Sequence, residues 1–161
     1  MDPEIKAPVP PEPPRGTYPA RVDEKGRLKL PVRFQEYLGE LPEKKLFVTS
    51  LDGHIARIYP ISVWKENEKF FETFTDDPQA AEDVAFMAND LGSDVAVDSQ
   101  GRLLLSPELR RELSLENQAV RLLFYKGRID VYSENLYAER KQQASEGRKE
   151  KILTLERKGL K

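Results

Sequence analysis

The sequence predicts an α+β fold in which two tandem β-β-α-β-β-α repeats form one pseudo-two-fold β-barrel with peripheral helices. Residues 23–31 read Asp-Glu-Lys-Gly-Arg-Leu-Lys-Leu-Pro, and residues 98–107 repeat the motif 75 positions later as Asp-Ser-Gln-Gly-Arg-Leu-Leu-Leu-Ser-Pro. The same order of apolar runs and turn residues follows both copies. Because an isolated two-stranded unit is only marginally stable, we expect the two repeats to share one core.

Each repeat is expected to begin with a hairpin. A short strand, 20–22 or 95–97, leads into a turn with Asp first and Gly fourth, and a second strand follows at 27–30 or 102–105. Asp suits the first position of a type I turn, and Gly accepts the left-handed conformation that follows it in a bulged hairpin. We therefore expect Asp23 to accept backbone hydrogen bonds within the turn, not to act in catalysis.

A short helix is expected after each hairpin. Pro31 and Pro107 suit the first helical position, where the missing N–H has no partner in any case. Ser106 adds an N-cap to the second helix, and Gly39 can end the first.

Each repeat is then expected to close with a second hairpin and another helix. Ser62 and Ser133 are expected to introduce these helices, and an aromatic residue, Trp64 or Tyr137, follows the last strand of each repeat at the same distance. The strands expected are 45–49, 55–59, 120–125 and 128–132.

The segments outside the repeats differ from them in composition. The connector has aromatic residues at helical spacing and a Thr-Asp-Asp-Pro break, and we expect its aromatics to join the core rather than a ligand site. The first residues hold six prolines and little apolar surface, which predicts a disordered arm. The expected divisions are the arm at 1–16, the first repeat at 17–65, the connector at 66–92, the second repeat at 93–140 and a charged tail at 141–161.

The charge is unevenly distributed along a chain whose net charge is −2. Residues 15–33 carry six bases and two acids, residues 66–98 carry ten acids and one base, and residues 139–161 carry eight bases and four acids. A segregated pattern of this kind can attract an anion at one surface and repel it at another. The bases of 15–33 coincide with the repeated motif, which favours a nucleic-acid contact there over a merely solvated face.

The candidate DNA contacts are cations in or beside the repeated turns. Arginine can bridge two acceptors on a phosphate or reach the major-groove edge of guanine. An ion pair with an acid of the opposite repeat is an equal alternative for Arg27 and the favoured one for Arg102, because the second copy has lost the surrounding bases. The candidates are Arg21, Lys25, Arg27, Lys29, Arg33 and Arg102.

Several other function classes find no support in the sequence. There is no cysteine, no Gly-x-Ser-x-Gly elbow, no phosphate-binding loop and no paired histidine motif, so we expect no enzyme activity, no cofactor and no metal. The lone histidine, His54, falls in an expected turn. No apolar run approaches a membrane span and no secretory signal is visible, so we expect a cytoplasmic protein without a membrane partner.

The tandem motif, together with Leu-Asp-Gly at 51–53, Ile-Tyr-Pro at 58–60 and Trp64, resembles the MraZ family over about residues 17–140. The resemblance implies an AbrB-like double swapped-hairpin barrel and a bacterial DNA-binding transcription regulator. It also implies binding to direct repeats in the promoter of the division and cell-wall gene cluster, nucleoid association and assembly of subunits into a ring-shaped homo-oligomer. In the family the lysine and arginine of the first motif face DNA, which are Lys25 and Arg27 here, and Arg102 belongs to the second motif.

The chain departs from the family pattern at two places. Gln35 stands where the family usually has an arginine, with Arg33 nearby as a substitute, and the connector is acidic where the family carries an arginine-rich helix. The acidic connector leaves a second hypothesis open, an oligomeric protein-interaction or assembly module that has lost DNA binding. A third is an antitoxin-like regulator whose tail at 141–161 binds a toxin.

Overall fold

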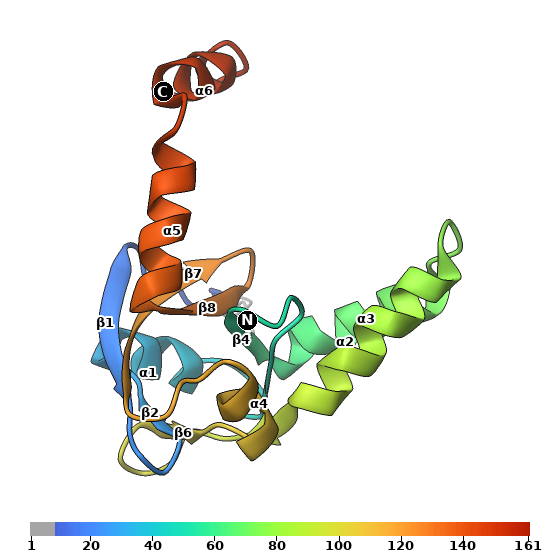
Figure 1. Cartoon of the computed structure of the whole chain (residues 1–161), viewed down its shortest axis with the longest axis vertical. Helices are drawn as coiled ribbons and strands as arrows, with labels where there is room; N and C mark the ends of the chain where they lie inside the picture. The colour runs from blue at the N-terminus through green and yellow to red at the C-terminus, as the bar shows by residue number, and fades with distance from the viewer. Residues whose placement is uncertain (1–8) are drawn as a thin grey trace, which may run out of the picture.

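The computed structural model describes residues 9–161 (Figure 1). The first half of the expected arm, residues 1–8, lies outside the described residues, and residues 9–15 form neither helix nor strand. The first repeat comprises β1 (Thr17–Val22), β2 (Arg27–Lys29), α1 (Val32–Gly39), β3 (Leu46–Thr49), β4 (Ala56–Pro60) and α2 (Ile61–Thr73). The second comprises β5 (Ser93–Val95), β6 (Arg102–Leu104), α4 (Pro107–Glu112), β7 (Gln118–Tyr125), β8 (Arg128–Ser133) and α5 (Glu134–Ser145).

Two more helices complete the chain. α3 (Pro78–Leu91) connects the repeats and α6 (Arg148–Glu156) follows α5. In Figure 1, α2 and α3 form a hairpin that projects from one side of the barrel, whereas α5 carries α6 away from it in another direction. Within residues 9–161, none of the helices has the length and apolar character that a bilayer span requires.

The strands form one eight-stranded antiparallel sheet in the order β5-β3-β4-β8-β7-β1-β2-β6, which curls into a nearly closed barrel. The first strand of each repeat pairs with the third strand of the other, β1 with β7 and β5 with β3. Two like pairs lie across the pseudo-two-fold axis, β2 with β6 and β4 with β8. The predicted fold class is thereby confirmed, and the hairpins are swapped between the repeats.

The core follows the duplication. Leu28 and Leu103 face each other across the β2–β6 pair, and Phe34 and Leu109 occupy equivalent places on α1 and α4; all four are fully buried. Full burial of a leucine or phenylalanine side chain stabilises the fold by roughly 1.5–3 kcal/mol relative to exposure. The barrel is therefore held by apolar layers to which both repeats contribute.

The prediction that the connector aromatics join the core is confirmed only in part: Trp64 and Phe71 lie in a second apolar cluster, whereas Phe74 is outside it and Phe70 is 56% exposed. The ring of Trp64 stacks on Phe47 with centroids 4.5 Å apart and meets the edge of Phe71 at 6.0 Å. Ala88 of α3 is fully buried in the same cluster. This cluster fixes the α2–α3 hairpin to the barrel.

Some element boundaries differ from the expectation. Ser62 lies inside α2, whose N-cap is Pro60, so the prediction that Ser62 introduces the helix is wrong; the chain turns into the helix one residue after β4. Ser133 does cap α5, since its Oγ accepts a hydrogen bond from the backbone N–H of Leu136 at 3.3 Å. The strand expected at 95–97 lies earlier in the chain, at Ser93–Val95 (β5), because its pairing with β3 ends at Val95.

Candidate nucleic-acid interface

The first hairpin turn is held by Asp23. Its Oδ1 accepts hydrogen bonds from the backbone N–H groups of Lys25 and Arg27, both at 2.9 Å, and its carbonyl accepts one from Gly26 at 3.1 Å. Gly26 has φ +81°, in the left-handed region that favours glycine. The predicted role of Asp23 in the turn is confirmed.

The second turn repeats this geometry. Oδ1 of Asp98 accepts from the backbone N–H groups of Gln100 and Arg102, both at 2.9 Å, and Gly101 has φ +75°. In each turn the hydrogen bond from the backbone N–H of the arginine, Arg27 or Arg102, does most to lower the pKa of the aspartate. Both carboxylates therefore stay ionised well into the acid range and keep the turns closed.

Each turn arginine pairs with the aspartate of its own turn. Nε of Arg27 donates to Oδ2 of Asp23 at 2.8 Å, and Nε of Arg102 donates to Oδ2 of Asp98 at 3.0 Å. The alternative of an ion pair with an acid of the opposite repeat is therefore wrong. Since only Nε is used, the two terminal nitrogens of each guanidinium have no hydrogen-bond partner among residues 9–161 and are available to a ligand.

Three cations form a row across three strands. Arg21 of β1 lies directly opposite Lys29 of β2, and Lys29 lies directly opposite Arg102 of β6. Residues directly opposite each other in antiparallel strands share a face at about 5 Å, and like charges in such pairs are destabilising. Arg27, two residues before Lys29 on β2, projects from the same face. The sheet thus gathers four cations on the surface opposite the leucine core.

The remaining candidates lie around this row. Lys25 is exposed in the turn itself. Arg21 donates from Nη2 to the Oδ1 of Asn117 at 2.7 Å, and Lys29 Nζ donates to the carbonyl of Gln100 in the second turn. Arg33 lies on α1 and pairs with Glu36 at 3.6 Å, so it stands outside the row.

Two residues that support the turns were missed from the sequence. Nη1 of Arg110, on α4 of the second repeat, donates to the carbonyl of Lys25 at the tip of the first turn. Nε of Arg110 lies 3.2 Å from Glu116 but is not aligned for a hydrogen bond. Gln35, on α1, occupies the equivalent place against Gly101 and donates from Nε2 to the carbonyl of Leu30 at 2.7 Å. Gln35 and Arg110 are 75 residues apart, the offset of the repeated motif, and this spacing could have identified them as equivalent residues.

The two turns are also bound to each other through their glycines. The backbone N–H of Leu30 donates to the carbonyl of Gly101, and that of Leu105 donates to the carbonyl of Gly26, both at 2.9 Å. Each turn is thus anchored by the other repeat, and the cation row is presented by a rigid unit. Within residues 9–161, no group of three or more His, Cys, Asp or Glu side chains is arranged to hold a metal ion.

Comparison with known proteins agrees with this architecture. The family model described as "MraZ protein, putative antitoxin-like" matches residues 92–155. A protein of Desulfitobacterium hafniense named Transcriptional regulator MraZ is 34% identical over 133 residues, which span 81% of this chain and 88% of that protein. Proteins of the same name from Acidobacterium capsulatum (41% over 98 residues, 61% and 66% of the two chains) and Tolumonas auensis (30% over 121 residues, 74% and 79%) also match. On the sequence match across both repeats and the swapped-hairpin barrel, the chain belongs to the MraZ family.

Proposed function

We propose that this chain is a sequence-specific DNA-binding regulator of bacterial transcription that uses the β1–β2–β6 face as its DNA surface. The observation that carries the proposal is the row of Arg21, Lys29 and Arg102 in one cross-strand register. Three cations in one cross-strand register repel one another, and the pairing of Arg102 with Asp98 offsets only one of the three charges. An anionic polymer laid along this face removes the repulsion and gains a charge-assisted contact from each side chain.

The two kinds of cation have different roles in this proposal. The row contacts phosphates and sets the position of the protein on the duplex. Phosphate contacts carry no direct information about the base sequence. Arg27 and Lys25 stand at the protruding turn, and a two-stranded ribbon fits the major groove, which is about 12 Å wide. The free terminal nitrogens of Arg27 match O6 and N7 of a guanine, so Arg27 is the base-reading residue.

One hairpin makes too few base contacts for tight binding. We infer that subunits assemble into a ring-shaped homo-oligomer whose turns meet repeated sites in a promoter, so that linked weak contacts add avidity. The target inferred from the family resemblance is the promoter of the division and cell-wall gene cluster. The protein then acts in the cytoplasm in association with the nucleoid.

Selection of bound DNA from a random duplex pool tests the proposal. We expect enrichment of a short guanine-containing motif in tandem copies and a binding constant that falls steeply with salt, with a log–log slope of about 0.9 per phosphate neutralised. A pool that stays random, or a flat salt dependence, contradicts DNA binding.

The second candidate is an oligomeric assembly module without DNA binding. The α2–α3 hairpin favours it, because this acidic element exposes 56% of Phe70 and 69% of Phe86. Particle mass measured by light scattering with and without the selected duplex separates the two functions. The assembly module predicts a stable oligomer whose mass does not change when DNA is added.

A further inference from the structure

The aromatic pair that follows the last strand is packed differently in the two repeats. β4 and β8 pair across the pseudo-two-fold axis, and Tyr59 and Trp64 in the first half correspond to Tyr132 and Tyr137 in the second. In the first half, Tyr59 packs against Trp64 with ring centroids 5.0 Å apart, and α3 covers both, so they are almost completely buried.

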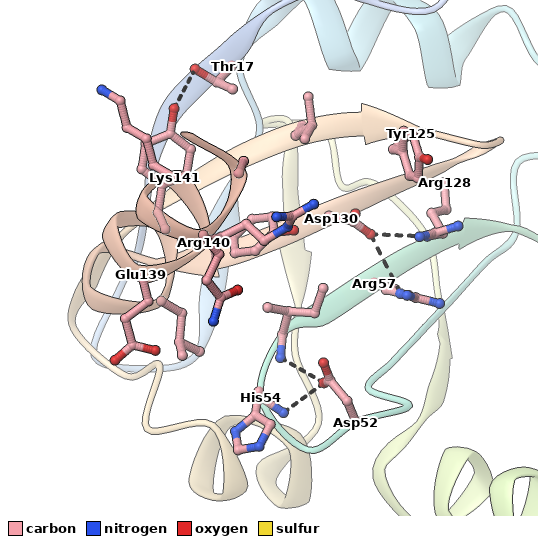
Figure 2. Close-up of a pocket in the computed structure, with 17 residues that line it drawn as sticks. Thr17, Asp52, His54, Arg57, Tyr125, Arg128, Asp130, Glu139, Arg140 and Lys141 are labelled. Atoms are coloured by element: carbon pink, nitrogen blue, oxygen red, sulfur yellow. Dashed lines mark hydrogen bonds and ion pairs between the residues drawn. The ribbon is translucent and has the colours of Figure 1, made fainter. Parts of the chain in front are cut away.

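The equivalent place in the second half has no covering helix of this kind among residues 9–161, although Arg121 lies over the ring of Tyr137 at 5.4 Å. The rings of Tyr132 and Tyr137 lie 6.2 Å apart, and no residue of α5 is buried. In place of α3 the chain continues into α6, which stands away from the barrel in Figure 1 and buries no residue either. A cavity of about 690 Å³ remains between α5, β7, β8 and the turn before β4 (Figure 2).

The floor of this cavity carries a surplus of positive charge. Asp130 is the only buried acid of the described residues, and Arg128 donates to it from Nε at 3.1 Å while Nε of Arg57 lies at 3.6 Å. One carboxylate therefore faces two guanidinium groups that are themselves largely buried, with exposures of 14% and 24%. Figure 2 shows the side chain of Arg140 directed from α5 into the same space.

The acids of the cavity offset only part of this charge, because the lining holds four cations, with Lys141 as the fourth, against the three acids Asp52, Asp130 and Glu139. Oδ1 of Asp52 is committed to its own turn, where it accepts from the backbone N–H groups of His54 at 2.8 Å and Ile55 at 3.0 Å. Glu139 lines the cavity from α5 and is exposed to solvent. Because unpaired charge in a partly desolvated site is costly, an anion placed among the arginines is favourable.

The walls are mainly apolar and aromatic. Ile55, Leu123 and Leu136 line the cavity together with the rings of Tyr125 and Tyr137. Cavities of roughly 300–1,000 Å³ with such walls and a few convergent polar groups are typical small-molecule sites. We propose that this cavity binds a small molecule that has a carboxylate or phosphate group for Arg57, Arg128 and Arg140 and a planar apolar body for the tyrosine walls. This site lies apart from the cation row, and the proposal does not depend on DNA binding.

Binding is tested on the full chain with three probes at constant ionic strength: benzoate, adenosine monophosphate and inorganic phosphate. Thermal unfolding is followed with increasing probe, and calorimetry gives the affinity. A ligand that binds only the folded state raises the midpoint with concentration. We expect benzoate or the nucleotide to raise it more than inorganic phosphate, because only these fill the apolar part. The stronger of the two identifies the anionic group as carboxylate or phosphate.

Arg140→Gln is the diagnostic variant, because Arg140 is exposed on α5 and its loss does not disturb the core. Removal of one charged hydrogen-bond partner is expected to weaken binding by about tenfold or more, and Arg140→Lys is expected to restore part of it. Lys149→Gln on α6 is the matched loss of one positive charge. Lys29→Gln controls for nucleotide bound at the cation row. Lys149→Gln is expected to bind every probe as the unmodified chain does, whereas Lys29→Gln is expected to lose only nucleotide or phosphate held at the cation row.

Two results overturn the proposal. One concerns probe binding: none of the three probes shifts the unfolding midpoint, or Arg140→Gln and the controls reduce the shift equally. The other is a change in particle mass by Arg140→Gln without a change in probe binding, which identifies the cavity as a contact for the acidic hairpin of a second copy.

Discussion

Lys29 on β2 and Arg102 on β6 lie directly opposite each other on the outer face of the barrel, at the seam where the two repeats meet. Their backbone neighbours Leu28 and Leu103 form the fully buried layer beneath them. The seam thus has an apolar inner side that forms the core and an outer side that carries adjacent positive charges, where Lys29 binds the carbonyl of Gln100 and Arg102 pairs with Asp98.

Replacement of Arg27 by alanine is expected to abolish specific DNA binding and leave the fold intact. The Arg27–Asp23 pair is partly exposed, and such pairs contribute little to stability because solvent screens their attraction. Gel retardation with a guanine-containing repeat array measures the loss, and circular dichroism checks the fold. Arg33→Ala, which removes a cation outside the row, is the control and is expected to retain binding. Unchanged retardation by Arg27→Ala contradicts its assignment as the base-reading residue.

Lys29→Gln is expected to lower DNA affinity uniformly across sequences and to reduce the log–log salt slope by about 0.9, the value for one phosphate contact. The free energy of unfolding should change by less than about 0.5 kcal/mol, since relief of repulsion from Arg21 and Arg102 offsets the lost hydrogen bond to Gln100. Titrations at several salt concentrations measure the slope. A sequence-selective loss would instead place Lys29 against a base.

Gly26→Ala is expected to destabilise the protein by about 1–3 kcal/mol, because a side chain is strained at φ +81° and its Cβ would overlap the guanidinium of Arg110. Gly39→Ala is the matched control. Gly39 is the last residue of α1 with open space around it, so alanine there should leave stability unchanged or raise it by up to about 1 kcal/mol. Denaturant unfolding distinguishes the two, and equal effects would argue against the contact with Arg110.

The turn aspartates are expected to contribute to acid unfolding. The pKa values of Asp23 and Asp98 are lowered in the folded protein from an ordinary value of 3.8. The folded state therefore binds fewer protons than the unfolded state, and this stabilisation is complete above about pH 4 and is lost as pH falls through the lowered values. The double variant Asp23→Asn, Asp98→Asn should lose less stability between pH 4 and pH 2 than the unmodified chain. Parallel unfolding curves across that range would contradict the assignment.

Local chemistry made the turns and several helix ends predictable, although Pro31 is the N-cap of α1 and not its first helical residue as expected. An aspartate and a glycine three residues apart specify the hairpin turn wherever it lies, and Ser106 and Ser133 cap helices through bonds to N–H groups three residues on. Leu28 alternates with the polar residues Arg27 and Lys29, whereas Leu103 stands in a run of three leucines whose sequence does not show that Leu103 is buried and Leu104 exposed. Ser62 failed as a cap because Pro60 ends β4 and begins the helix directly.

The long-range contacts between these elements could not be predicted from local sequence. Lys29 lies opposite both Arg21 and Arg102 only because three strands are in register: β1 and β2 of the first repeat and β6 of the second. The hydrogen bond from Arg110 to the carbonyl of Lys25 likewise joins residues 85 positions apart through the packing of α4. Such contacts depend on long-range closure, whose geometry no local pattern encodes.

The sequence by itself thus determined the duplicated unit, its rigid turns and its cations, because each of these depends on residues only a few positions apart. Tertiary structure decided which cations stand side by side, that each turn arginine pairs within its own turn, and that one repeat is filled by aromatic side chains where the other leaves a cavity. The physical reason is that swapping strands between the repeats brings different sequences to equivalent places, and only their packing settles what each place becomes.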